Sequence, residues 1–189
     1  MKARNVDHTG ARTVASLSIP NREVVTCYQE LFLEWLDQAV GGTAQTDALG
    51  RALLGGDLQE FQARLQRVVV ESLSYFDVGG KTPEAVYQAF LVGLLVHLDA
   101  THIVDTNRES GFGRYDVCVT PRSAGAGALL ELKSVDPERE TWEEALASAM
   151  KQLHDRDYAS ALRRAGAEPI WLWAAVFDGK RLRVSVERG

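Results

Sequence analysis

The chain has 189 residues, a length typical of one domain with a core of its own. Apolar residues make up 46% and charged residues 25%, proportions that exclude a disordered or fibrous chain. The formal net charge of -5 argues against a protein that coats nucleic acid through charge alone. No apolar run reaches the roughly 18 residues of a membrane span.

Targeting and cysteine signals favour a cytoplasmic protein. The N-terminal stretch carries basic residues but lacks the apolar centre of a secretory signal. Cys27 and Cys118 lie far apart and form no CxxC motif, so neither a disulfide framework nor a thiolate metal site is expected. A reducing, cytoplasmic location and no membrane partner are the resulting predictions.

The first half of the chain predicts helices. Residues 1–19 show no periodicity and are expected to form a loose arm. Beyond them, apolar residues recur at intervals of three and four, and Asn21, Asp57 and Thr82 precede such stretches as capping residues. The predicted helices cover residues 21–39, 46–54, 57–76 and 84–98, with a loop at 77–81.

The second half predicts short strands around one long helix. The segments are rich in β-branched and apolar residues and are separated by Gly, Pro and Ser. Asp178-Gly179 is a strong hairpin signal, and Gly166 is a natural end for the preceding helix. The predicted strands cover residues 101–106, 114–120, 128–133, 169–178 and 180–188, and the helix covers 140–166.

This order of elements predicts an α/β domain with a mixed central sheet flanked by helices. A helical subdomain over residues 20–80 is expected to precede the core, which covers 81–189 and forms one compact unit with it. We expect no second, independent domain, because the sequence shows no internal repeat and no low-complexity tract.

Two acids and a lysine lie in strands that otherwise read as buried. Alternation along a strand puts Glu131 and Lys133 on one face, and Asp116 shares a face with Cys118 and Thr120. If the two strands pair, Asp116 can meet Glu131 and Lys133. Two converging carboxylates repel each other unless a cation lies between them, and Mg²⁺ or Mn²⁺ is the natural choice. A lysine beside them could hold an attacking water and offset phosphoryl charge.

The pair GRYD and ELK, with its order of elements, resembles the PD-(D/E)xK nuclease superfamily. The usual proline before the first acid is Tyr115 here. Longer stretches such as TNRESGFGRYDVCVTP and YQAFLVGLL are similar to the nuclease-like domain found behind AAA-ATPase-like modules in bacterial proteins. The resemblance covers roughly residues 17–187, but no GxxxxGK[ST] motif occurs, so a stand-alone copy or a cut-out domain is expected.

The resemblance implies a restriction-endonuclease-like α-β-β-β-α-β core and a Mg²⁺-dependent nuclease acting on nucleic acid, with DNA the favoured substrate. It implies a catalytic site with Asp116 and Glu131 as metal ligands, the Leu132 carbonyl completing the set and Lys133 as the catalytic lysine. An AAA-ATPase-like module or a second copy of the chain is the implied protein partner.

The resemblance also implies supporting residues on the two helices that flank the strands. Gln152 and Tyr158 match the glutamine and tyrosine of recombination-type nucleases. Many relatives carry a histidine where this chain has Gln88, a weaker metal ligand, and Glu84 lies one turn earlier on the same face.

Each of these residues also has a simpler interpretation. The two acids and the lysine could be ordinary charges on an exposed strand face. Arg114 could bind phosphate, although pairing with a nearby acid is the better expectation, and Cys118 is expected to serve packing. The tryptophans at 171 and 173 are expected in the core rather than stacked on bases. Two alternative functions remain open: a weakly active or inactive nuclease fold that binds nucleic acid or a protein, and an oligomerisation domain.

Overall fold

The structure is a computed structural model, and it describes residues 2–9, 12–18, 43–72, 84–106, 109–110, 113–136, 138–155 and 158–189. The chain divides into two compact units, Met1–Ala39 and Val40–Gly189. The predicted helix over 21–39 and the loop at 77–81 lie outside the described residues, and so does the predicted start at Thr82 and Pro83.

The described part of the first unit is a β-hairpin rather than the loose arm that the sequence suggests. β1 (Lys2–Thr9) pairs antiparallel with β2 (Arg12–Ser18), and Thr9 is opposite Arg12. A two-residue connection is the commonest way to join two antiparallel strands. The register shifts between Arg4 and Val6, and such an irregularity weakens the simple alternation by which a strand is recognised in a sequence.

The second unit is built on a five-stranded mixed sheet in the order β3-β6-β7-β8-β9. The β7–β8 pair is parallel, and the other pairs are antiparallel. The strands are β3 (His102–Thr106), β6 (Val117–Pro121), β7 (Gly125–Ser134), β8 (Ala167–Asp178) and β9 (Arg181–Arg188), and a separate short pair joins β4 (Glu109–Ser110) to β5 (Gly113–Arg114).

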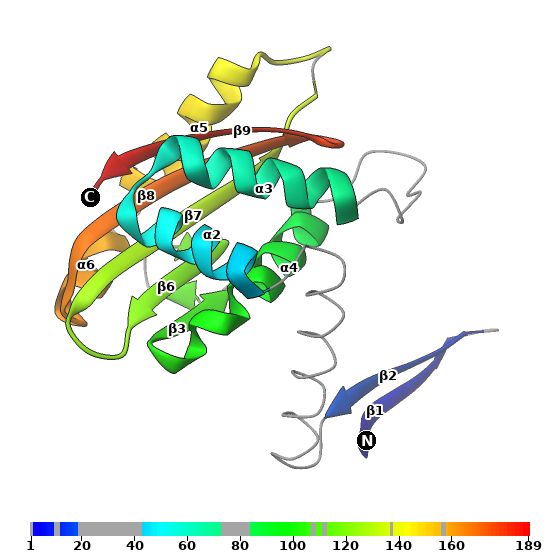
Figure 1. Cartoon of the computed structure of the whole chain (residues 1–189). Coiled ribbons are helices and arrows are strands. Elements are labelled where there is room, and N and C mark those ends of the chain that lie inside the picture. The colour runs from blue at the N-terminus through cyan, green and yellow to red at the C-terminus, as the bar shows by residue number, and fades with distance from the viewer. Residues whose placement is uncertain are drawn as a thin grey trace. The chain divides into compact units, whose positions relative to one another are not determined.

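Helices cover both faces of this sheet (Figure 1). One face packs against α2 (Thr43–Gly55), α3 (Leu58–Ser72) and α4 (Glu84–Leu95), which continues into the 3-10 helix η2 (Val96–Ala100). The other face packs against α5 (Trp142–Asp155) and α6 (Tyr158–Arg164). Among the described residues, no helix is long and apolar enough to cross a membrane.

Aromatic side chains of β8 fill the core on the α2, α3 and α4 side. The Trp173 ring is fully buried, lies 4.5 Å from the Phe61 ring and donates its Nε1–H to the Leu53 carbonyl at 3.2 Å. Phe177, four residues along the same strand face, stacks on the Tyr87 ring at 4.0 Å. The expectation that Trp173 belongs to the core is therefore confirmed.

Glutamines of α3 cover the outer edge of β9. The Leu182 amide donates to Gln66 Oε1 at 2.8 Å, and the Val184 amide donates to Gln62 Oε1 at 3.0 Å. Gln66 also donates from Nε2 to the Lys180 carbonyl at 2.5 Å. These side chains satisfy edge groups that would otherwise invite pairing with another chain.

The element order α4-β3-β6-β7-α5-β8 confirms the predicted α-β-β-β-α-β core with a mixed sheet. The predicted helices over 46–54 and 57–76 correspond to α2 and α3, the latter described as far as Ser72, and the Glu60 amide donates to the predicted cap Asp57 at 3.0 Å. The prediction of one long helix over 140–166 was also wrong, because the structure has two helices there, α5 and α6. Gly166 ends the second, and its φ of +83° suits glycine.

Candidate active site

Strand register brings the two predicted acids together. Val117 of β6 is opposite Leu130 of β7, so Asp116, one residue earlier, faces the position of Glu131. The sequence placed Asp116 within a strand, but in the structure it lies at a bend just before β6. Its Oδ2 accepts a hydrogen bond from the Leu132 amide at 2.8 Å, which ties the carboxylate to the strand that carries Glu131.

Glu131 and Lys133 lie on the face of β7 that packs against α5. Glu131 is only 7% exposed, which is unusual for a carboxylate and requires local compensation. Lys133 is partly exposed, and its Nζ donates to Ser148 Oγ on α5 at 2.8 Å. The residues of β7 from 128 to 130 and Leu132 are apolar and buried, so Glu131 is not a charge of a solvated strand face.

Gln152 of α5 connects the acid to the lysine. With its amide oriented so that both ends find a partner, the nitrogen donates to Glu131 Oε1 and the oxygen accepts from Lys133 Nζ at 3.1 Å. Ser148 lies one helical turn earlier, and positions four residues apart share one face of a helix. The sequence interpretation missed Ser148, although its spacing from Gln152 was the available signal.

The two predicted residues of α4 contact the backbone of the acid-bearing strands. Gln88 donates from Nε2 to the Asp116 carbonyl at 2.6 Å. The Ser134 amide, at the end of β7, donates to Glu84 Oε1 at 3.0 Å. Both contacts hold in place the strand ends that carry Asp116 and Lys133, so in this structure α4 acts on the geometry of the site through the backbone.

Tyr158 and Arg114 occupy less central positions. Tyr158 is buried at the start of α6, and its ring meets Tyr115 edge to face at 5.3 Å, within the hydrophobic cluster between the sheet and α5 and α6. Arg114 is opposite Glu109 in the β4–β5 pair. Tyr158 therefore contacts Tyr115, the residue before Asp116, from within the hydrophobic core.

The donor set suits a hard divalent cation. Carboxylate oxygens and backbone carbonyls are the ligands that Mg²⁺ prefers, and this ion is often held by only one or two carboxylates plus waters. Asp116 and Glu131 offer two carboxylates at facing positions, while the Leu132 group that the structure places on Asp116 is the amide. Within the part of the chain that the structure describes, no group of three or more His, Cys, Asp or Glu residues could hold a metal ion.

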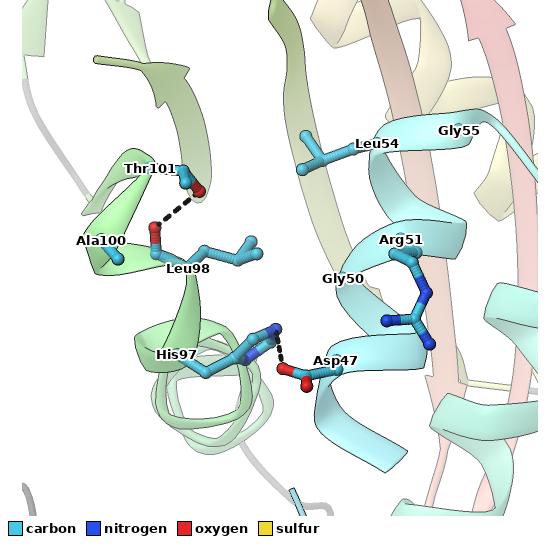
Figure 2. Close-up of a pocket in the computed structure, with 9 residues that line it drawn as sticks. All are labelled: Asp47, Gly50, Arg51, Leu54, Gly55, His97, Leu98, Ala100 and Thr101. Atoms are coloured by element: carbon cyan, nitrogen blue, oxygen red, sulfur yellow. Dashed lines mark hydrogen bonds and ion pairs between the residues drawn. The ribbon is translucent and has the colours of Figure 1, made fainter. Parts of the chain in front are cut away.

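In the described part of the chain, one cavity lies beside this cluster and a larger one lies away from it. The larger, of about 480 Å³, lies between α2 and η2 and is lined by residues such as Asp47, Arg51 and His97, none of which belongs to the predicted site (Figure 2). The smaller, of about 220 Å³, is lined by Tyr115 and Cys118, the neighbours of Asp116, among other residues.

Cys118 is a packing residue, as its sequence context suggested. Burial raises the pKa of its thiol to about 11, the hydrogen bond with Thr120 opposes that rise, and the Asp105 charge adds to it. The thiol is therefore protonated at neutral pH, which makes it a poor nucleophile and a poor metal ligand.

This fold and this cluster define a restriction-endonuclease-like protein: a mixed sheet in which one strand begins beside an aspartate and the next carries an E-x-K motif. The sequence profile of the PD-(D/E)XK nuclease superfamily matches residues 82–187, more than half of the chain. The chain belongs to this superfamily. No curated protein matches the sequence of this chain.

Proposed function

We propose that the chain is a metal-dependent nuclease that hydrolyses phosphodiester bonds, with DNA as its substrate. Membership of the nuclease superfamily supports the reaction class. The observation that carries the proposal is the meeting of Asp116, Glu131 and Lys133 on one end of the β6–β7 pair, with Gln152 between the acid and the lysine.

The residues of the chain divide the work in this proposal. Asp116 and Glu131, with the Leu132 carbonyl, would hold Mg²⁺ or Mn²⁺. When bound, such an ion supplies Lewis acidity, which stabilises negative charge on phosphoryl oxygens and makes water more acidic. Lys133 would donate to a non-bridging phosphoryl oxygen and orient the attacking water, because its ammonium carries three donors on a flexible stem.

Gln152 and Ser148 are positioning residues in this scheme. Gln152 contacts Glu131 and Lys133 at once, and Ser148 accepts a hydrogen bond from Lys133. Side chains that are held by such partners lose less freedom when substrate binds, which is how preorganised sites lower a barrier. Both partners lie on α5, so that helix sets the distance between acid and lysine.

A second function is favoured by one observation. Gln88 stands where the resemblance gives many relatives a histidine, and its amide donates a hydrogen bond to the Asp116 carbonyl. The described residues hold no third metal-binding side chain at the site. Such a site fits a nuclease fold that cuts slowly and mainly binds a partner. The partner would be nucleic acid, or a protein such as an AAA-ATPase-like module or a second copy of the chain. We place this function second, because a two-carboxylate site is sufficient for Mg²⁺.

A plasmid-nicking assay with Mg²⁺ and Mn²⁺ tests the proposal. Lys133→Met keeps most of the length of the side chain but removes the charge, and we expect loss of nicking by a factor of about 100 or more. Lys180→Met is the matched control, because Lys180 is exposed in the β8–β9 turn. Full activity in Lys133→Met would refute the mechanism. Absence of nicking in the wild type, with retained nucleic-acid binding, would favour the second function.

A further inference from the structure

The smaller cavity lies beside the predicted catalytic residues on the same face of the sheet. Cys118 follows Asp116 by two residues, and Leu129 precedes Glu131 by two residues, so both share the face of the acids. Both line the cavity, together with Tyr115, Asp105, Thr120 and Tyr158. A group that occupies this space would therefore be a direct neighbour of whatever lies on Asp116 and Glu131.

Polar side chains line this space together with apolar ones, and Asp105 supplies a carboxylate. Asp105 of β3 is opposite Cys118, and Ile103 is opposite Thr120, so Asp105 and Thr120 come from neighbouring strands. Both are partly exposed. Asp105 contributes an acceptor, and Thr120 contributes a hydroxyl that can donate or accept. The cavity thus combines one carboxylate with the hydroxyls of Thr120 and two tyrosines, and with aromatic and aliphatic walls.

The charge in the cavity selects against phosphate and in favour of a donor. A carboxylate repels an anion at close range, and it can only accept hydrogen bonds when ionised. Sites that take an unpaired base combine aromatic and apolar walls with a few polar groups, as this lining does. Among the bases, guanine presents two neighbouring donors, N1–H and the N2 amino group, on its Watson–Crick edge, and two parallel bonds to one carboxylate are possible only with such a pair.

We propose that this cavity is a base subsite that takes an unpaired guanine next to the scissile phosphodiester, with Asp105 accepting from its Watson–Crick edge. The proposal rests on the proposed function, because it names the substrate feature that the same site reads. It also predicts a preference for single-stranded or locally opened nucleic acid, since base pairing hides the edge that Asp105 would contact.

The test compares oligonucleotides that differ in one amino group. A short, labelled single-stranded DNA with one guanine among thymines is compared with the same strand carrying inosine, which lacks the N2 amino group. Binding is measured by fluorescence anisotropy with Ca²⁺ in place of Mg²⁺, and cleavage is measured separately with Mg²⁺. We expect the wild type to bind the guanine strand about tenfold more tightly than the inosine strand, and to bind its duplex form more weakly.

Two variants assign this preference to Asp105. Asp105→Asn should bind both strands equally, because it loses the charge and half of the accepting capacity. Asp47→Asn is the matched control: it makes the same change in the larger cavity, far from the acids in the sequence, and should keep the wild-type preference. The guanine–inosine comparison on the wild type needs no variant, so misfolding of Asp105→Asn would not prevent the test.

The outcomes separate the two proposals. Cleavage with equal binding of the guanine and inosine strands would overturn the subsite and leave the nuclease. A guanine preference that disappears in Asp105→Asn, without cleavage, would support the subsite and overturn the nuclease. Loss of the preference in Asp47→Asn as well would overturn the assignment to this cavity. No binding of any strand, together with no cleavage, would overturn both proposals.

Discussion

Replacing Glu131 by glutamine should make the protein more stable and remove its response to divalent cations. Glu131 is 7% exposed, so its carboxylate is largely removed from water. Its position in β7 is opposite that of Asp116, the residue before Val117. Glutamine has nearly the same shape. It retains an oxygen that can accept the bond from Gln152.

The magnitude follows from three electrostatic contributions. Opposed positions on paired strands are about 5.5 Å apart, and two unit charges at that distance repel by about 3 kcal/mol in a medium with an effective dielectric constant of about 20. The substitution also loses attraction to Lys133, about 2.4 kcal/mol for a separation of about 7 Å. These two effects nearly cancel. Relief of the desolvation of a buried carboxylate then leaves a net gain of about 1–2 kcal/mol, or about 2–8 °C in Tm.

Thermal unfolding with and without Mg²⁺ gives the decisive comparison. A ligand at 100 times its Kd stabilises the folded state by about 2.7 kcal/mol, or about 5–11 °C for a domain of this size. We expect the wild type to melt below Glu131→Gln without the cation and above it with the cation. Glu138→Gln, an exposed acid, is the control and should match the wild type in both conditions. A less stable Glu131→Gln with an unchanged response to Mg²⁺ would refute the reasoning.

Two further predictions concern stability away from the site. Gly56→Ala should destabilise the fold by at least about 1–2 kcal/mol, because Gly56 has a φ of +70° and a Cβ there would lie 2.6 Å from the Trp171 ring. Gly55→Ala should stabilise the fold by about 0.4–1 kcal/mol, because a Cβ there would meet nothing within 4 Å. Equal urea midpoints for the two variants would contradict this prediction. Hydrogen bonds from the Thr141 amide and hydroxyl lower the pKa of Glu144, so their stabilisation is complete above the ordinary glutamate pKa and is lost as pH falls through the lowered value. Glu144→Gln should therefore be less stable than the wild type at pH 7 in urea unfolding, and the difference should shrink as the pH falls through the lowered pKa of Glu144. A difference that does not shrink in acid would contradict the assignment.

The meeting of Asp116 and Glu131 could be predicted from the sequence because it depends on two local rules. Alternation fixes which residues share a strand face, and a short Gly-containing connection makes adjacent strands pair. The structure has both, since Pro121 of β6 is followed after a few residues by Gly125 of β7. What the acids do chemically stays a prediction, since neither rule concerns chemistry.

The contacts of α4 could not be predicted in the same way. Gln88 and Glu84 lie on one face of a helix that is apolar almost all round, so periodicity does not show which side meets the strands. Their partners, the Asp116 carbonyl and the Ser134 amide, are backbone groups and leave no signature in a sequence. The cavity beside Tyr115 has the same origin: Asp105 reaches it only because β3 pairs with β6 in one particular register.

The position of the charges within the sheet also argues for a site rather than for surface decoration. β7 and β8 form a parallel pair covered by helices on both faces, a setting in which strands are usually apolar throughout. Most of β7 follows that rule, and its residues from 127 to 132 are buried. A carboxylate at 131 lowers the stability of such a strand, and the neighbouring Gln152 and Lys133 offset only part of that loss. A protein that needed this strand only for its fold would gain stability from an apolar residue there. The cost is understandable if the carboxylate binds something that the apolar residue could not.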